Sequence, residues 1–114
     1  MQRGHLSEIF INLLKNAREA IGRAGTIRIK ADRLQDNSIE ISIRDSGGGI
    51  PPDKIKRIFE AYYTTKNGGS GMGLAIVRHN TELYGGTVRV NSEVGRGAEF
   101  VLTFPAKAIV NVRK

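Results

Sequence analysis

The sequence predicts an α/β fold, a two-layer sandwich in which a mixed, largely antiparallel sheet is covered on one face by three helices. Two observations lead to this prediction. Two stretches place apolar residues at helical spacing, a third follows two prolines that suit the first turn of a helix, and four shorter stretches alternate apolar and polar residues with the period of a strand. The strand-like stretches form two pairs with a short turn inside each pair, as in antiparallel hairpins. A chain of 114 residues supports one core, so residues 1–114 are expected to form a single domain.

Apolar residues recur on one face of the first and third predicted helices, as burial against a sheet requires. The three helices are residues 4–21, 53–62 and 73–84. Gly22 ends the first helix, the prolines at 51–52 open the second because proline suits a first turn, and Gly85 stops the third. A mobile loop is expected over residues 63–71.

The predicted strands alternate apolar and polar side chains, as half-buried strands do. They are residues 26–31, 38–44, 87–91 and 98–104. Asp36 and Asn37 supply the turn of the first hairpin, and residues 95–97 supply a turn with two glycines in the second. Pro105 ends the last strand, because proline cannot donate to the hydrogen-bond ladder.

The composition narrows the class of protein. There is no cysteine, which excludes disulfides and thiolate metal sites and makes a reducing compartment, the cytoplasm, the simplest setting. No apolar run approaches the ~20 residues that span a bilayer, and the start of the chain lacks the apolar core of a signal peptide. A longer parent protein could still be anchored in a membrane.

The formal net charge of +7 raises nucleic-acid binding as one hypothesis, because Lys and Arg neutralise phosphates. The cations are dispersed along the chain, and no aromatic residues interleave with them as a stacking platform requires. A solvated surface or a small anionic ligand accounts for the charge, so no nucleic-acid partner is expected.

Asn12 and Asn16 lie one helical turn apart, on one face of the first predicted helix and at the border of its apolar stripe. Carboxamide oxygens are hard, neutral ligands that suit Mg²⁺, which keeps several waters and takes its remaining oxygens from phosphates. The alternative is that both residues simply face water at the edge of the helix.

Asp45 ends a predicted strand and is followed by a run of glycines that includes Gly47 and Gly49. A carboxylate in this position can accept a hydrogen bond from the exocyclic amine of adenine, whereas guanine presents a carbonyl there, so ATP would be favoured over GTP. The glycines would let the backbone approach the base or sugar. The alternative is an ordinary glycine turn capped by an Asp.

A second glycine cluster runs into the third predicted helix. Its residues are Gly69, Ser70, Gly71, Met72, Gly73 and Leu74. Backbone N–H groups at a helix N-terminus can bind phosphate, and Lys66 stands just before the cluster, where it can add a positive charge. The alternative is a flexible connector. The P-loop and dinucleotide-binding fingerprints are both absent.

Taken in order, these clusters resemble the motifs of the superfamily that joins gyrase, the heat-shock chaperone, histidine kinases and the MutL repair protein. The N box, the first glycine box, the F box and the second glycine box match residues 12–17, 45–49, 59–66 and 69–74. The resemblance covers nearly the whole chain. It implies a Bergerat-type fold that binds Mg-ATP between the N-box helix and a flexible lid at about residues 62–70.

The resemblance also implies a role for each matching residue. Asn16 would hold Mg²⁺ with help from Asn12. Asp45 would read adenine, the amides of residues 69–73 would cradle the phosphates, and Lys66 would reach the γ-phosphate. The implied nucleotide-binding residues are Asn12, Asn16, Asp45, Gly47, Gly49, Lys66, Gly69, Ser70, Gly71, Met72, Gly73 and Leu74. The implied catalytic residues are Asn12 and Lys66.

Asn12 distinguishes between branches of this superfamily. The gyrase-like and chaperone ATPases carry a Glu at this position that activates water, and an amide is no general base. Poor hydrolysis is therefore expected. The short segment between the F box and the second glycine box is similar to that of nitrogen-regulation and sporulation histidine kinases. These kinases transfer the γ-phosphoryl group to a histidine on a separate dimerisation domain, from which it passes to a response regulator.

The two histidines of the chain, His5 and His79, lack the flanking residues that mark an acceptor histidine in that family. The acceptor is expected before Met1 in a longer, homodimeric parent, and the isolated domain is expected to be a monomer that does not label itself. Two other functions stay open. One is a serine kinase that acts on an anti-sigma-factor antagonist, and the other is a nucleotide-sensing interaction module with little catalysis.

The chain departs from the histidine kinase pattern in two places, which together comprise three residues. Glu19 and Ala20 stand where many of these kinases carry a Lys and an aromatic residue, so one phosphate contact and one stacking contact do not carry over. Ala98 stands where a hydroxyl residue usually follows the last Gly-x-Gly, so a second polar contact to the purine does not carry over either. Asp45 must then supply more of the recognition.

Overall fold

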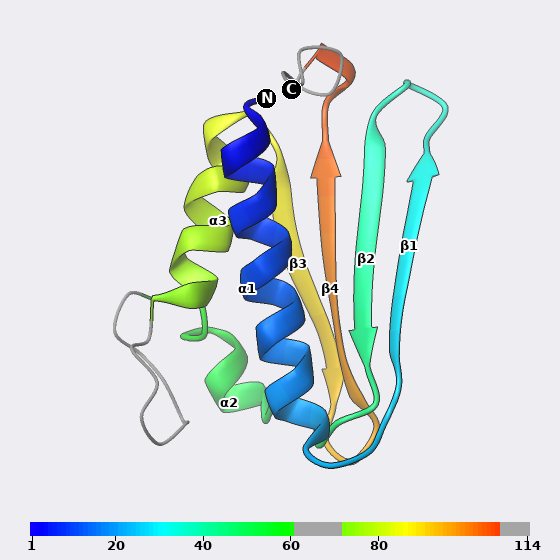
Figure 1. Cartoon of the computed structure of the whole chain (residues 1–114), viewed down its shortest axis with the longest axis vertical. Coiled ribbons are helices and arrows are strands. Elements are labelled where there is room, and N and C mark those ends of the chain that lie inside the picture. The colour runs from blue at the N-terminus through cyan, green and yellow to red at the C-terminus, as the bar shows by residue number, and fades with distance from the viewer. Residues whose placement is uncertain (61–71, 108–114) are drawn as a thin grey trace.

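The computed structural model describes residues 1–60 and 72–107, and its helices lie on one side of a sheet (Figure 1). The elements follow one another as α1 (Arg3–Ile21), β1 (Ile27–Arg33), β2 (Ile39–Asp45), α2 (Pro52–Ile55), α3 (Gly73–Leu83), β3 (Thr87–Glu93) and β4 (Gly97–Phe104). The predicted two-layer α/β sandwich is confirmed.

The sheet has the strand order β1-β2-β4-β3, and each neighbouring pair among these described strands is antiparallel. The two predicted hairpins, β1-β2 and β3-β4, join through their second strands. This pairing places Ile43 of β2 opposite Phe100 of β4 at the centre of the sheet. The last residue of β2, Asp45, therefore lies opposite Ala98 near the start of β4.

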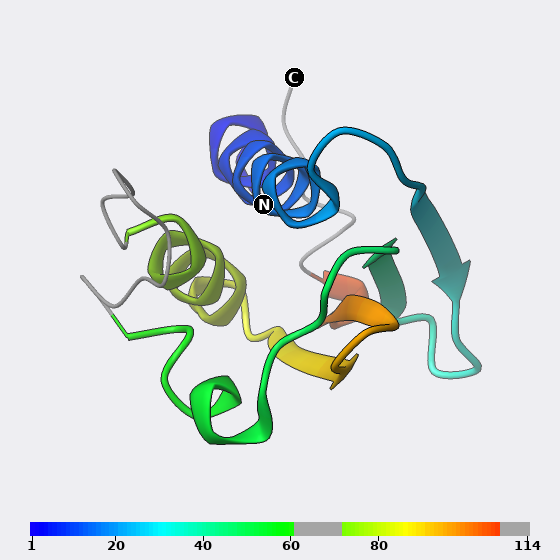
Figure 2. The same ribbon diagram turned by 90° about the horizontal axis from the view of Figure 1, so that it is seen from below.

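The helices α1 and α3 pack side by side on one face of the sheet (Figures 1 and 2). The core between the layers consists of buried apolar side chains from both: Ile9, Leu13, Ala17, Ile41, Ile43, Val77, Ala98, Phe100, Leu102 and Phe104. Each large apolar side chain buried here contributes about 1.5–3 kcal/mol. Because Ile9, Leu13 and Ala17 face the sheet, the rotation of α1 is set, and Asn12 and Asn16 come to lie half-buried beside this stripe.

The second helix is shorter than predicted. It ends at Ile55, and the chain continues in turns whose hydrogen bonds span three residues rather than four. The ring of Phe59 packs edge-on against Phe100, with 6.1 Å between the ring centroids. This contact with the core draws the chain out of a helical path, so the prediction of a helix over residues 53–62 was wrong in length. Residues 61 and 62 lie outside the described residues.

No helix in residues 1–60 and 72–107 has both the length and the apolar character that crossing a membrane requires.

The turn of the first hairpin contains the residues predicted for it. Asn37 adopts φ 67°, the left-handed conformation that Asn tolerates better than most residues. The backbone N–H of Ser38, at 2.9 Å, and its hydroxyl both donate to Oδ1 of Asp36. These two donors, the hydroxyl first, hold the pKa of Asp36 below its ordinary value.

Replacing Ser38 with Ala is expected to move the pKa of Asp36 back toward its ordinary value, because the stronger of the two donors to the carboxylate is lost. A lowered folded pKa stabilises the fold at pH values above the ordinary pKa, and this contribution disappears as the pH falls through the lowered value. Ser38→Ala should therefore flatten the pH dependence of stability in that acidic window. An NMR titration of the Asp36 carboxyl measures the change, and an unaltered pKa would contradict it.

Candidate functional site

Asn12 connects the two helices of the site. Its Nδ2 donates a hydrogen bond of 2.8 Å to the backbone carbonyl of Glu8, one turn earlier in α1. Its Oδ1 therefore points the other way, toward the first residue of α3: a Cβ added to Gly73 would lie 3.0 Å from this oxygen. Asn16 lies one turn further along the same edge of α1, also half-buried. The structure thus places Asn12 beside the end of the second glycine cluster, with Asn16 one turn further along α1.

Helix α3 begins at Gly73, where the prediction put it. The preceding residue, Met72, occupies the N-cap position. Its side chain makes no capping hydrogen bond to the N–H groups of the first turn of the helix. Met72, Gly73 and Leu74 are all half-buried. The other members of this cluster fall outside the described residues: Lys66, Gly69, Ser70 and Gly71.

Asp45 is a buried carboxylate with one oxygen committed to the protein. Its side chain is only 2 % exposed, and Oδ1 accepts a hydrogen bond of 2.9 Å from the backbone N–H of Gly47. No hydrogen bond within residues 1–60 and 72–107 involves Oδ2. No fully buried side-chain oxygen of the described residues lacks a hydrogen-bond partner, so Oδ2 keeps some exposure and is open to accept a hydrogen bond from a ligand.

The glycines after Asp45 have a role that the sequence alone did not reveal. A Cβ on Gly47 would lie 2.5 Å from the backbone carbonyl oxygen of Ala20, at the end of α1. Gly49 adopts φ +78°, and a Cβ there would lie 2.4 Å from the carbonyl oxygen of Glu93. Both glycines therefore let the loop pack against the protein's own backbone. Gly48, absent from the predicted site, is the glycine of this loop whose Cβ position opens into free space.

These contacts make α1 the element shared by both predicted clusters. Its middle, at Asn12, touches the start of α3, and its end, at Ala20, touches the loop after β2. Figure 2 shows this loop crossing the end of the sheet toward α2. Among the described residues no group of three or more His, Cys, Asp and Glu side chains could hold a metal ion, so a cation here would need amide, phosphate or water oxygens.

Two serines beside the loop were missed by the sequence reasoning. The Oγ of Ser46 accepts a hydrogen bond of 2.8 Å from the N–H of Thr26, and the Oγ of Ser92 accepts one of 2.7 Å from the N–H of Ile50. Ser46 is adjacent to Asp45 in the sequence and could have been suspected. Ser92 is 42 residues from its partner, and only the register of the sheet reveals it.

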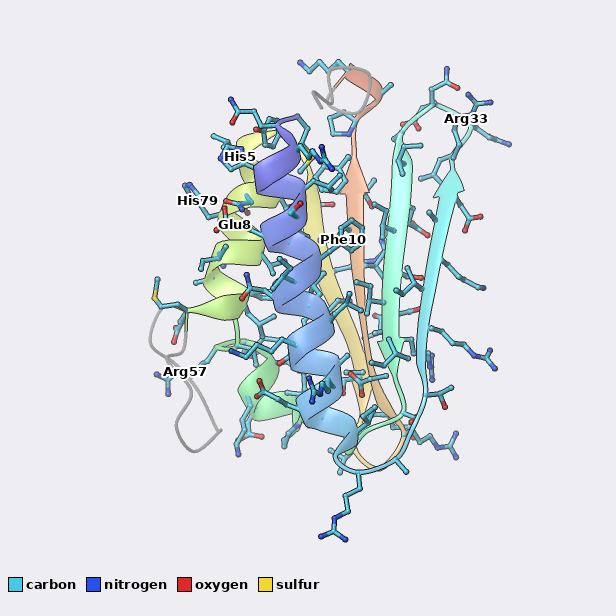
Figure 3. The ribbon with its side chains drawn as sticks, viewed as in Figure 1. His5, Glu8, Phe10, Arg33, Arg57 and His79 are labelled. Carbon is cyan, nitrogen blue, oxygen red and sulfur yellow. The ribbon has the colours of Figure 1, made fainter. Side chains whose placement is uncertain are left out.

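The two histidines lie away from this loop (Figure 3). His5 is near the start of α1, where its Nδ1 forms a hydrogen bond with the hydroxyl of Tyr84 and the two rings are 5.5 Å apart. His79 is exposed on α3. Neither is next to Asp45 or Asn16 in the described fold.

A family model described as "Histidine kinase-, DNA gyrase B-, and HSP90-like ATPase" matches residues 1–108. Among curated proteins, the sensor histidine kinase ZraS of Salmonella typhimurium is 43% identical over 103 residues, which are 90% of this chain and 22% of ZraS. Sporulation kinase E of Bacillus subtilis is 38% identical over 109 residues, which are 96% of this chain and 15% of that kinase. The chain thus spans less than a quarter of the length of either relative.

The fold of this chain is similar to that of solved histidine kinase structures. The catalytic domain of the histidine kinase ThkA, in a nucleotide-free form, superposes with a TM-score of 0.81 at 32% identity, over 91% of this chain and 68% of that one. Full-length ShkA in complex with AMPPNP superposes with a TM-score of 0.80 at 37% identity, over 90% of this chain and 21% of that one.

Proposed function

Because the chain belongs to the family of histidine kinase-, DNA gyrase B- and HSP90-like ATPases, we propose that it binds Mg-ATP and donates the γ-phosphoryl group to a histidine of a longer sensor kinase. The observation that carries this proposal is the buried carboxylate of Asp45, whose Oδ1 is held by Gly47 while Oδ2 has no hydrogen bond within the described residues. The similarity to sensor and sporulation kinases supports the choice of branch.

Asp45 would recognise the adenine base. The exocyclic amine of adenine donates to Oδ2, and the bond from Gly47 to Oδ1 keeps the carboxylate in place before the base arrives. Guanine presents a carbonyl oxygen at the same position, which would face a fixed negative charge in a buried place. ATP is therefore preferred to GTP, in the way that sites built for one donor reject an analogue without it.

Asn16 would hold Mg²⁺, with Oδ1 of Asn12 nearby. This donor set fits the ion, because Mg²⁺ binds hard oxygens and takes most of its shell from phosphates and water. When bound, the ion neutralises charge on the phosphates. The N–H groups that open α3, at Gly73 and Leu74, would bind phosphate oxygens. The same role for Gly69, Ser70 and Gly71, and a contact of Lys66 with the γ-phosphate, remain predictions.

Asn12 also explains why transfer is preferred to hydrolysis. A carboxamide cannot take a proton from water, and its Nδ2 is already bonded to the carbonyl of Glu8. An acceptor imidazole needs no such base, because its unprotonated nitrogen attacks the γ-phosphorus directly while the bond to the bridging oxygen of ADP breaks. The role of the chain is then to position and stabilise the triphosphate, with Asn12 and Lys66 as its proposed catalytic residues.

The partners of the chain follow from this proposal. They are ATP, a histidine-bearing dimerisation domain of the same parent protein, and a response regulator that receives the phosphoryl group. We propose that residues 1–114 form one catalytic domain, monomeric by itself and part of a homodimeric parent.

Calorimetric titration of the chain with Mg-ATP and Mg-GTP tests the binding step, and labelling of the full-length parent with ATP tests the transfer. Binding of Mg-ATP in preference to Mg-GTP, and an acid-labile phosphoryl group on the parent, are the expected results. An acid-stable phosphoester would identify a serine kinase instead. Binding without transfer to any acceptor would indicate a nucleotide-sensing module.

Replacing Ala98 with Ser is expected to tighten Mg-ATP binding. Ala98 is 5 % exposed and lies directly across from Asp45, where side chains of paired residues are close enough to share a ligand. One added hydrogen bond to the purine is worth about 1 kcal/mol, or roughly fivefold in Kd. Ala31, which is exposed on β1, provides a matched control. Ala31→Ser makes the same substitution in another strand and should leave the Kd for Mg-ATP unaltered. Weaker binding by Ala98→Ser would contradict the assignment.

A further inference from the structure

The turn between β3 and β4 holds the loop that follows Asp45. Ser92, on β3, accepts a hydrogen bond of 2.7 Å from the N–H of Ile50 through its Oγ, and the same hydroxyl donates one of 3.1 Å to the carbonyl of Gly97. A third bond, of 2.8 Å, runs from the N–H of Gly95 to the carbonyl of Gly48. The loop and the turn are thus joined at two points.

The register of the sheet brings this turn next to Asp45. Ser92 pairs with Ala98, and Ala98 pairs with Asp45, so the three residues form one row across β3, β4 and β2. Gly97 packs on the same strand end: it adopts φ +97°, and a Cβ there would lie 2.0 Å from the carbonyl oxygen of Asp45. The loop leaves the sheet at Asp45, and its far end is held at Ile50 by Ser92.

We infer that Ser92 is a positioning residue for adenine recognition, an inference that rests on the proposed binding of ATP. Its hydroxyl already accepts from Ile50 and donates to Gly97, so it acts through the loop rather than on the base. Fixing the far end of the loop limits the conformations of Gly47, whose N–H orients Oδ1 of Asp45. A carboxylate oriented before binding loses less entropy when adenine arrives.

The substitution Ser92→Ala removes both hydrogen bonds of the hydroxyl. The N–H of Ile50 and the carbonyl of Gly97 then lose Ser92 as their partner. The loop then keeps the hydrogen bond between Gly95 and Gly48 but loses the hydrogen bond between Ile50 and Ser92 at its far end. The expected consequence is a loop that still folds but samples more positions, which weakens a ligand that needs one of them. The substitution Ser92→Thr would keep the hydroxyl, and threonine suits a strand.

The test compares Ser92→Ala, Ser92→Thr and a matched control, Ser38→Ala, at a temperature where all are folded. Ser38 is a serine whose hydroxyl is likewise bonded to the protein, but it lies before β2, whereas Asp45 lies at the end of that strand. We expect Ser92→Ala to raise the Kd for Mg-ATP roughly five- to twentyfold. Ser92→Thr should bind nearly as the natural chain does, and Ser38→Ala should lower the melting temperature without changing Kd.

Hydrogen exchange of the Ile50 amide gives a readout that needs no nucleotide. This amide should exchange faster in ligand-free Ser92→Ala than in the natural chain or in Ser38→Ala. Unchanged Kd in Ser92→Ala, or unchanged exchange at Ile50, would overturn the inference even if stability falls. Failure of the natural chain itself to bind Mg-ATP would contradict the proposed function instead, and the exchange rate would still show whether Ser92 holds the loop.

Discussion

Replacing Asn16 with Ala is expected to slow phosphoryl transfer by roughly a hundredfold in the full-length parent, because the proposed ligand of the ion that would neutralise the phosphates is lost. Asn16 is half-buried on the exposed side of the stripe that faces the sheet, so its side chain contributes little to the core. The fold should therefore persist. The rate of transfer from ATP to the acceptor histidine measures the effect.

The isolated chain offers a second measurement of the same change. The natural chain should bind ATP more tightly with Mg²⁺ than without it, and Asn16→Ala should reduce that difference while ATP binding without Mg²⁺ stays the same. Asn91, exposed on the opposite face of the sheet, is a matched control: Asn91→Ala should alter neither quantity. Unchanged transfer and unchanged Mg²⁺ dependence in Asn16→Ala would remove this residue from the proposed metal site.

Replacing Asp45 with Asn is expected to weaken Mg-ATP binding by roughly 30- to 100-fold and to affect folding far less. The natural carboxylate accepts a hydrogen bond from Gly47 at Oδ1 and, in the proposed complex, would accept one from adenine at Oδ2. A carboxamide has one oxygen and one NH₂ group, so one of these two donors must face another donor. If the oxygen stays with Gly47, the NH₂ group points at the base and suits the carbonyl of guanine.

The Asp45→Asn variant therefore has a signature beyond weaker binding, namely a lower preference for Mg-ATP over Mg-GTP. Asp36→Asn is the matched control, since it removes the same charge from a residue that also accepts local hydrogen bonds, at the other end of β2. It should lower stability and leave both nucleotide affinities alone. Equal affinity of the natural chain and Asp45→Asn for Mg-ATP would overturn the adenine assignment.

The element that was predicted least well shows where local patterns stop being informative. The prolines at 51–52 favour the first turn of a helix and led to the prediction of one over residues 53–62, yet α2 ends at Ile55. The reason lies in another part of the chain, because Phe59 packs on the ring of Phe100 in β4. The long helices and the strands were predicted close to their observed bounds, since each has a periodic face large enough to determine its conformation before any partner is known.

Some features of the candidate site could likewise be predicted from the sequence, and others could not. Asp45 at the end of a strand, and Asn12 with Asn16 on one helical edge, could be predicted because a strand end and a helical turn are local properties. The reasons for Gly47 and Gly49 could not, because the obstacles are the carbonyls of Ala20 and Glu93. The predictions for Lys66 and residues 69–71 lie outside the described residues.

Helix and strand periods and the order of the motifs lie within short stretches of chain, so the fold class, the family and the residue types of the candidate nucleotide site could be predicted from them. That β2 and β4 are neighbours, and that Asp45, Ala98 and Ser92 therefore form one row, became known only from the folded structure. The register between strands distant in sequence depends on how a whole core packs, and no local pattern of residues specifies it.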